Sequence, residues 1–147
     1  MLLEYRNVLV AVDGSPQAER AFHKAVAIAL RNQSRLVIAH ILNQSLMQHT
    51  TLLTQNIYEQ LETEAQNMLN DYAEHARQQG VGEVDLILQT GNPKQLLSED
   101  IPQRENINLI VLGATGLNAL ERMLVGSSSE YIVQHAQTDV LVVRSGA

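Results

Sequence analysis

The chain contains no cysteine, no tryptophan and a single phenylalanine. Without cysteine, disulfides, thiol catalysis and cysteine metal sites are excluded. Because aromatic side chains are scarce, the core of these 147 residues has to be built from Val, Leu, Ile and Ala. Only two lysines occur, Lys24 and Lys94, and the net charge is −6. We therefore expect no clustered basic face of the kind that binds nucleic acid.

Long apolar runs are also missing, and none approaches the roughly 20 residues that a membrane-spanning helix needs. The first six residues already include the charged Glu4 and Arg6, so the start is too short and too soon charged for a signal peptide. We expect a cytoplasmic protein with no membrane partner, folded as one domain over residues 1–147.

Five short apolar runs, rich in β-branched residues, alternate with helical patterns. The runs cover residues 8–12, 36–41, 84–88, 109–112 and 140–143. All except the third are nearly continuous in apolar character, which is typical of parallel strands buried on both faces. The third alternates more and is predicted at an edge. Because strand and helix alternate throughout, the predicted fold class is α/β, a doubly wound sandwich with right-handed crossovers.

Two of the predicted helices lie in the first half of the chain. Ser15 caps the first, and Pro16 occupies its first helical position. The second carries an apolar stripe from Ile57 to Ala76 and ends at Gly80. The polar stretch 43–56 before it is predicted as a loop, either a lid or a plain surface connection.

Two further helices are predicted in the second half. One opens at Asn92 and Pro93 and is limited by Pro102. The other covers residues 127–136, where Ser127 and Glu130 have the spacing of a capping box.

Glycines and hydroxyls follow the fourth predicted strand. Gly113 and Gly116 come first, and Gly126 with Ser127–Ser129 opens the last helix. Glycine lets backbone N–H groups approach an anion, and a helix start adds free N–H groups and the positive end of its dipole. The pattern indicates a phosphate site, with a simple turn and a capping serine as an equal alternative.

Two polar residues lie near the carboxyl ends of the first and second strands. Asp13 can accept hydrogen bonds from a ribose or base, hold a metal, or merely cap its turn. For His40 a structural role is favoured over catalysis, and His23, His49 and His75 are expected to be solvated.

No phosphate-binding P-loop motif occurs and no Gly-x-Gly-x-x-Gly follows the first strand, which argues against P-loop NTPases and dinucleotide-binding folds. No catalytic residue is assigned.

Along essentially its whole length the chain resembles the universal stress protein family. The ATP-binding members of that family carry Gly-x2-Gly-x9-Gly-Ser/Thr, and Gly113, Gly116, Gly126 and Ser127 reproduce this spacing in full. The other matching segments are residues 8–15, 39–41, 91–93, 109–113, 135–136 and 140–143. Asp139 departs from the family, which often has proline before the last strand.

The resemblance implies a Rossmann-like fold of the adenine nucleotide alpha hydrolase type, with five parallel strands in the order 3-2-1-4-5. It implies ATP as the ligand, with Mg²⁺ or Mn²⁺ held through the phosphates. Three groups of residues would contact ATP: Ala11, Val12, Asp13 and Ile41 the ribose and adenine; Leu112, Gly113 and Gly116 the ribose and α-phosphate side; and Gly126, Ser127, Ser128 and Ser129 the outer phosphates.

The resemblance also implies a homodimer, in which the last strand pairs with its copy through Val140, Leu141, Val142 and Val143. Left alone, this strand would be an open apolar edge. The function expected is an ATP-binding stress-response regulator whose nucleotide occupancy alters its conformation or its binding of an unknown protein partner. Two alternatives stay open. One is a slow ATPase using Glu121, Glu130 or a serine hydroxyl to orient water, and the other is a dimerisation module without nucleotide.

Overall fold

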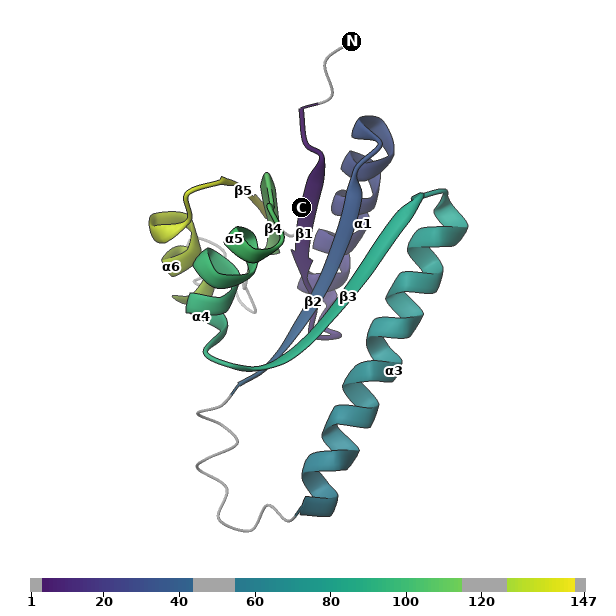
Figure 1. Ribbon diagram of the computed structural model, residues 1–147, viewed down its shortest axis with the longest axis vertical. Helices are drawn as coiled ribbons and strands as arrows, with labels where there is room; N and C mark the ends of the chain where they lie inside the picture. The colour runs from purple at the N-terminus through teal and green to yellow at the C-terminus, as the bar shows by residue number, and fades with distance from the viewer. Residues whose placement is uncertain (1–3, 44–54, 115–126, 145–147) are drawn as a thin grey trace.

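The computed structural model describes residues 4–43, 55–114 and 127–144 (Figure 1). Within them five strands form one parallel sheet in the order β3-β2-β1-β4-β5. The strands are β1 (Asn7–Ala11), β2 (Arg35–Asn43), β3 (Glu83–Gly91), β4 (Leu109–Gly113) and β5 (Asp139–Val143). This confirms the predicted α/β class, the strand order and the edge position of the third strand.

Helices cover both faces of the sheet (Figure 1). One face carries α1 (Pro16–Asn32) and α3 (Gln55–Gln79), and the other carries α4 (Pro93–Gln95), α5 (Ile101–Arg104) and α6 (Ser127–His135). Successive strand side chains point to opposite faces. In β1, Val8 and Val10 therefore pack with the α1 and α3 cluster, while Leu9 packs with Ile132 of α6 on the other side.

Local signals set the ends of the two long helices. The Ser15 Oγ accepts a hydrogen bond from the Ala18 N–H at 3.1 Å and so caps α1, as predicted. Gln33 ends α1 in the left-handed region with φ 52°, and Gly80, with φ 110°, follows α3. Both conformations stop a helix because its next carbonyls turn away from the axis.

The third predicted helix differs from expectation at Pro102. Asn92 caps it, accepting from the Lys94 N–H at 3.0 Å, but the helix runs past Pro102 to Arg104. Proline has no N–H for the carbonyl four residues earlier, and its ring crowds that carbonyl. A π-helical turn, η1 (Leu96–Asp100), widens the helix just before it, and Ile101 N–H bonds to the Leu96 carbonyl five residues back.

The β2–β3 pair is longer than the rest of the sheet. Its register continues to Asn43 opposite Gly91, beyond the last β1–β2 pair, Ala11 with Ala39. Of the predicted loop 43–56, Asn43 belongs to β2 and residues 55–56 belong to α3, whereas residues 44–54 lie outside the described part of the chain. The last residues of β2 therefore extend beyond the carboxyl end of β1.

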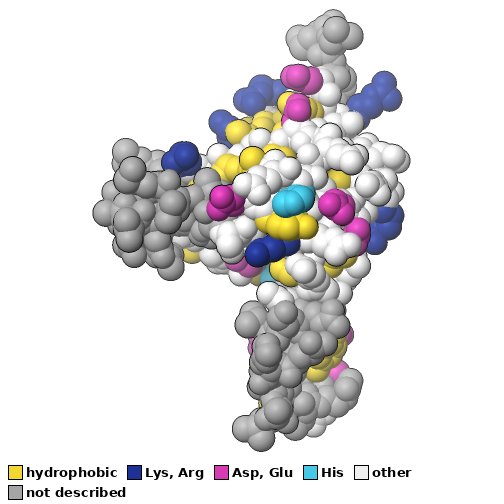
Figure 2. Space-filling view, turned by 90° about the vertical axis from the view of Figure 1, so that its left-hand side faces the viewer, with side chains coloured by type: hydrophobic (Ala, Val, Ile, Leu, Met, Phe, Trp, Pro, Cys, Tyr) yellow, Lys and Arg dark blue, Asp and Glu magenta, His cyan; other side chains and the backbone are white. Residues whose placement is uncertain are grey.

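The face formed by α4, α5 and α6 is shown in Figure 2. Acidic, basic and hydrophobic side chains are interspersed on it, and the residues described there form no extended basic area.

Candidate functional site

A cavity of about 300 Å³ lies at the carboxyl ends of β1, β2 and β4. The first turn of α1 and the start of α6 close it on two sides, and Pro93 and Leu97 contribute from the α4 and η1 segment. In doubly wound sheets this is the edge where ligands bind, because the chain leaves neighbouring strands in opposite directions and opens a crevice.

The loop after β1 holds Asp13 at the rim of the cavity. Val12 N–H continues the sheet by bonding to the Ala39 carbonyl at 2.9 Å. The chain then turns at Gly14, whose φ of 82° favours glycine, and the Asp13 Oδ1 accepts from the Ser15 N–H at 2.9 Å. One carboxylate oxygen is thus fixed by its own turn, while the exposed side chain lines the cavity.

Gly113 brings the end of β4 against the start of α1. A Cβ placed there would lie 2.7 Å from the Gln17 carbonyl carbon and would overlap the Gln17 oxygen. Only glycine leaves room for this backbone contact. The buried Ser129 Oγ donates to the Gly113 carbonyl at 3.3 Å, which ties the first turn of α6 to the same point.

His40 lines the cavity from β2. Its Nδ1 lies 2.7 Å from the Val12 carbonyl oxygen. Because a carbonyl only accepts, Nδ1 carries the proton of this bond, and in the neutral ring Nε2 is left as an acceptor. The bond holds the imidazole between the first two strands, which agrees with the structural role favoured from the sequence and also places the ring at the site.

The structure brings eight of the predicted ligand residues together around this cavity: Ala11, Val12, Asp13, Ile41, Leu112, Gly113, Ser128 and Ser129. Ser127 is the exposed first residue of α6 and does not line it. Gly116 and Gly126 lie outside the described residues, as does Glu121, while Glu130 is exposed on α6 away from the cavity. The structure makes Ser127 the first helical residue of α6 and not the capping residue before it, so the capping box of Ser127 and Glu130 stays a prediction.

The sequence did not single out Gln17, Ala18, Leu97 or Ile132, which also line the cavity. Gln17 and Ala18 belong to the first turn of α1. The capping Ser15 and Pro16, which predict the start of this helix, were the sequence signal that could have placed them near the strand ends. The other two look like ordinary core positions. Only their packing against β1 and β4 puts them at the site.

The cavity carries little charge. Among its described lining residues Asp13 is the single carboxylate, and Lys and Arg are absent. An anion here would depend on backbone N–H groups, the hydroxyl of Ser128 and the start of α6, because the Ser129 hydroxyl already donates to the Gly113 carbonyl. No group of three or more metal-ligating side chains occurs in the parts of the chain that the structure describes.

The edge strand β5 is bonded to β4 on one side within the described sheet. Its four predicted interface residues, Val140 to Val143, are all half-buried. Asp139 begins the strand, and its Oδ2 accepts from the Tyr5 hydroxyl at 2.8 Å. This hydrogen bond, helped by burial and the negative charge, raises the pKa of Tyr5 to about 12. The residue that departs from the family therefore holds the start of β5 to the segment before β1.

Comparison with known proteins decides the family, because the universal stress protein family model matches residues 4–144. This chain belongs to the universal stress protein family. A candidate universal stress protein of Staphylococcus aureus strain USA300 is 40% identical over 144 residues, which cover 98% of this chain and 87% of that protein. Among solved structures, universal stress protein UspA from Lactobacillus plantarum is 34% identical and superposes with a TM-score of 0.81, covering 96% of this chain and 99% of the other.

More distant structures share the fold. The hypothetical protein MJ0577 has a TM-score of 0.84 at 22% identity, covering 98% of this chain and 99% of its own. A universal stress protein in complex with cAMP has a TM-score of 0.75 at 23% identity, covering 97% of this chain and 99% of its own.

Of the helices described in the present chain, none combines the length and apolar character needed to cross a membrane.

Proposed function

We propose that this universal stress protein binds ATP, with Mg²⁺ or Mn²⁺, at the carboxyl ends of β1, β2 and β4. In this proposal it acts in the cytoplasm as a regulatory homodimer, and nucleotide occupancy alters its conformation or its binding of a protein partner. The observation that carries the proposal is one cavity lined by eight of the residues that the resemblance assigns to the nucleotide.

The nucleoside half of the ligand suits the chemistry of this cavity. Leu112, Ile132 and Ile41 offer apolar surface to a flat heterocycle, and ligand pockets combine such surface with a few placed polar groups. The Asp13 carboxylate at the rim can accept from ribose hydroxyls. The Nε2 of His40, left as an acceptor, can receive an N–H of the base.

The phosphates need donors, because the described lining residues supply no positive side chain. Ser128 and Ser129 stand in the first turn of α6, where the Ser128 hydroxyl, backbone N–H groups and the helix dipole favour negative charge. A divalent ion carried with the nucleotide would neutralise part of the remaining charge. The size of the cavity is at the lower end of the range for ligand pockets, about 300–1,000 Å³, so the phosphates are expected to extend toward the α6 start.

The test compares melting temperatures with and without ATP–Mg²⁺ for two charge variants on α6. Ser128→Glu puts a carboxylate at an exposed cavity position, whereas Gln134→Glu adds the same charge at an exposed position away from it. We expect ATP to raise the melting temperature of the wild type and of Gln134→Glu, but not of Ser128→Glu. An equal rise in all three proteins would place ATP elsewhere. AMP and cAMP, included as competitors because one member of the family was solved with cAMP, distinguish the adenine nucleotides.

Slow hydrolysis is a second candidate with weaker support. Asp13 is the one described carboxylate at the cavity, and it lies on the β1 side, away from the α6 start. Phosphate release by the wild type that disappears in Ser128→Glu would favour the ATPase. Release that persists in this variant would point to a contaminating enzyme.

A further inference from the structure

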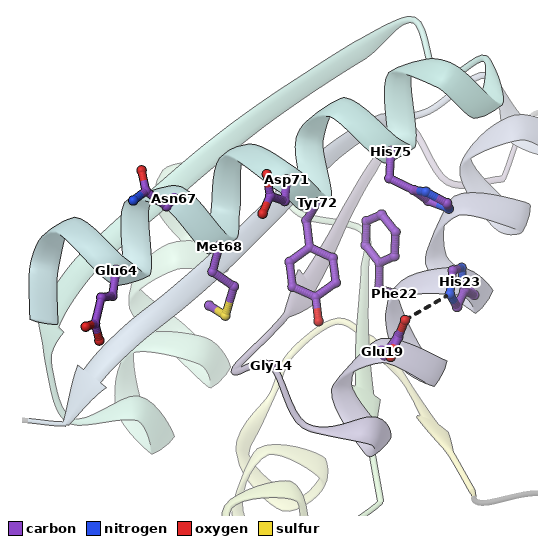
Figure 3. A pocket seen from close by; sticks show the side chains of 10 residues that line it. All are labelled: Gly14, Glu19, Phe22, His23, Glu64, Asn67, Met68, Asp71, Tyr72 and His75. Carbon is purple, nitrogen blue, oxygen red and sulfur yellow. Dashed lines mark ion pairs between the residues drawn. The ribbon is translucent and has the colours of Figure 1, made fainter.

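A second cavity, of about 550 Å³, lies between α1 and α3 (Figure 3). It shares no lining residue with the nucleotide cavity. Gly14 lines it, while the neighbouring residues Asp13 and Ser15 line the nucleotide cavity, so the two cavities lie on either side of the same β1–α1 loop. Nothing in the proposed nucleotide function uses this second cavity.

Aromatic and thioether side chains form the apolar part of this groove. Phe22, from α1, is 1% exposed, and its ring centroid lies 4.7 Å from that of Tyr72 on α3. Met68 continues the apolar surface one turn earlier along α3 (Figure 3). His75 is half-buried rather than solvated as expected, with its ring 5.8 Å from Phe22 and 5.4 Å from His23.

The charged residues of the groove are all acidic. Glu19 comes from α1, and Glu64 and Asp71 come from α3. The Glu19 carboxylate lies 3.8 Å from the His23 Nε2. Burial, and then the negative charges of Glu19 and Asp13, raise the pKa of the Tyr72 hydroxyl. Lys and Arg are absent from the residues described around the groove.

We propose that this groove binds a small organic cation, a protonated amine carried on an aromatic or aliphatic body. Its apolar surface matches the body of such a ligand, and the half-buried ring of Tyr72 attracts a cation near its face. The three carboxylates complement the ammonium charge and repel anions. A volume of about 550 Å³ suits a small molecule. A bare metal ion fits less well, because no three ligating side chains converge in the described part of the chain.

The test uses three probes of one shape and different charge: 2-phenylethylamine, 2-phenylethanol and phenylacetate. Because Phe22 is the single phenylalanine of the chain, its ring signals in an NMR spectrum need no separation from other phenylalanines. We expect the amine to shift the ring signals of Phe22 and Tyr72 in a saturable way. The neutral alcohol should bind more weakly and the anion not at all. Equal binding of alcohol and amine, or no saturable shift with the amine, would overturn the proposal.

Variants on α3 locate the binding. Asp71→Lys reverses a charge of the groove, while Glu74→Lys reverses an exposed charge on the same helix outside it. We expect Asp71→Lys to weaken amine binding by about tenfold, because it places a positive charge beside the ligand. Glu74→Lys should leave binding within about twofold, because Glu74 does not line the groove and solvent screens its charge from the ligand. Equal weakening by both would show attraction to the overall charge and would reject the groove. Far-UV circular dichroism and the unchanged Phe22 signals of the free proteins control for folding.

Discussion

Replacing Gly113 with alanine tests how the end of β4 meets α1. The added Cβ would lie 2.7 Å from the Gln17 carbonyl carbon and 3.2 Å from the Ala18 nitrogen. All the neighbours are backbone, so no side chain can rotate away, and the start of α1 has to shift. Overpacking of this kind costs about 1–3 kcal/mol. For a chain of this size each kcal/mol lowers the melting temperature by about 2–4 °C.

Two other glycines provide matched controls. At Gly91 the added Cβ would meet the Leu96 Cδ1 at 2.7 Å, the far end of a flexible side chain, so a smaller loss is expected. At Gly82 nothing lies within 4 Å, and alanine should be neutral or slightly stabilising because it restricts the unfolded chain. The predicted order of stability is Gly82→Ala, then Gly91→Ala, then Gly113→Ala.

The assay is urea unfolding followed by far-UV circular dichroism, since the chain has no tryptophan to report by fluorescence. Gly113→Ala should also weaken nucleotide binding, because Gln17 and Gly113 both line the cavity. If Gly113→Ala were as stable as Gly82→Ala, the close contact between β4 and α1 would not exist as described.

Three further predictions concern charges and the sheet edge. The hydrogen bond from Arg35 lowers the pKa of Glu105; burial opposes this effect and Arg104 adds to it. The stabilisation of the fold by the Glu105–Arg35 pair is therefore present above the ordinary carboxyl pKa and fades as pH falls through the lowered pKa. Glu105→Gln should cost about 1–2 kcal/mol at neutral pH, and a deficit that persists in strong acid would argue against the ion pair. Asp139→Asn should lower the pKa of Tyr5 from about 12 toward 10, and an unchanged alkaline absorbance titration would reject the Tyr5–Asp139 hydrogen bond. The stabilisation by this hydrogen bond is present below pH about 10 and is lost as pH rises through the folded-state pKa of Tyr5. Val142→Asp should split the proposed dimer by burying an unpaired charge, whereas an unchanged sedimentation coefficient would exclude the β5 interface.

Much of the fold was predictable because burial leaves a simple trace in the sequence. The runs that became β1 and β4 are apolar on both sides, since helices cover both faces there. The extension of β2 and β3 past the core was missed, because Gln89 and Thr90 give no apolar pattern where the strands leave the helices. The π turn before Pro102 was missed for a different reason. Proline normally ends a helix, and only the observed backbone shows how this helix widens instead.

The candidate site was predictable from the sequence where its residues follow strand ends. Asp13 and Gly113 gave signals as turn residues after apolar runs. The parts of the cavity lining that come from α1 and η1 depend on packing between segments distant in the sequence, and no local sequence pattern predicts such packing. The same holds for the groove between α1 and α3, where His75 was expected to be solvated but its ring lies tilted against that of Phe22, with the centroids 5.8 Å apart.

The central claim, nucleotide binding at the carboxyl ends of the strands, is tested most directly by isothermal titration of the purified, nucleotide-stripped protein with ATP, with and without Mg²⁺. The account predicts saturable binding of about one ATP per chain, because each chain contributes one such cavity. The absence of heat, together with no nucleotide co-purifying with the protein by mass spectrometry, would contradict the claim and favour a dimerisation module that works without nucleotide.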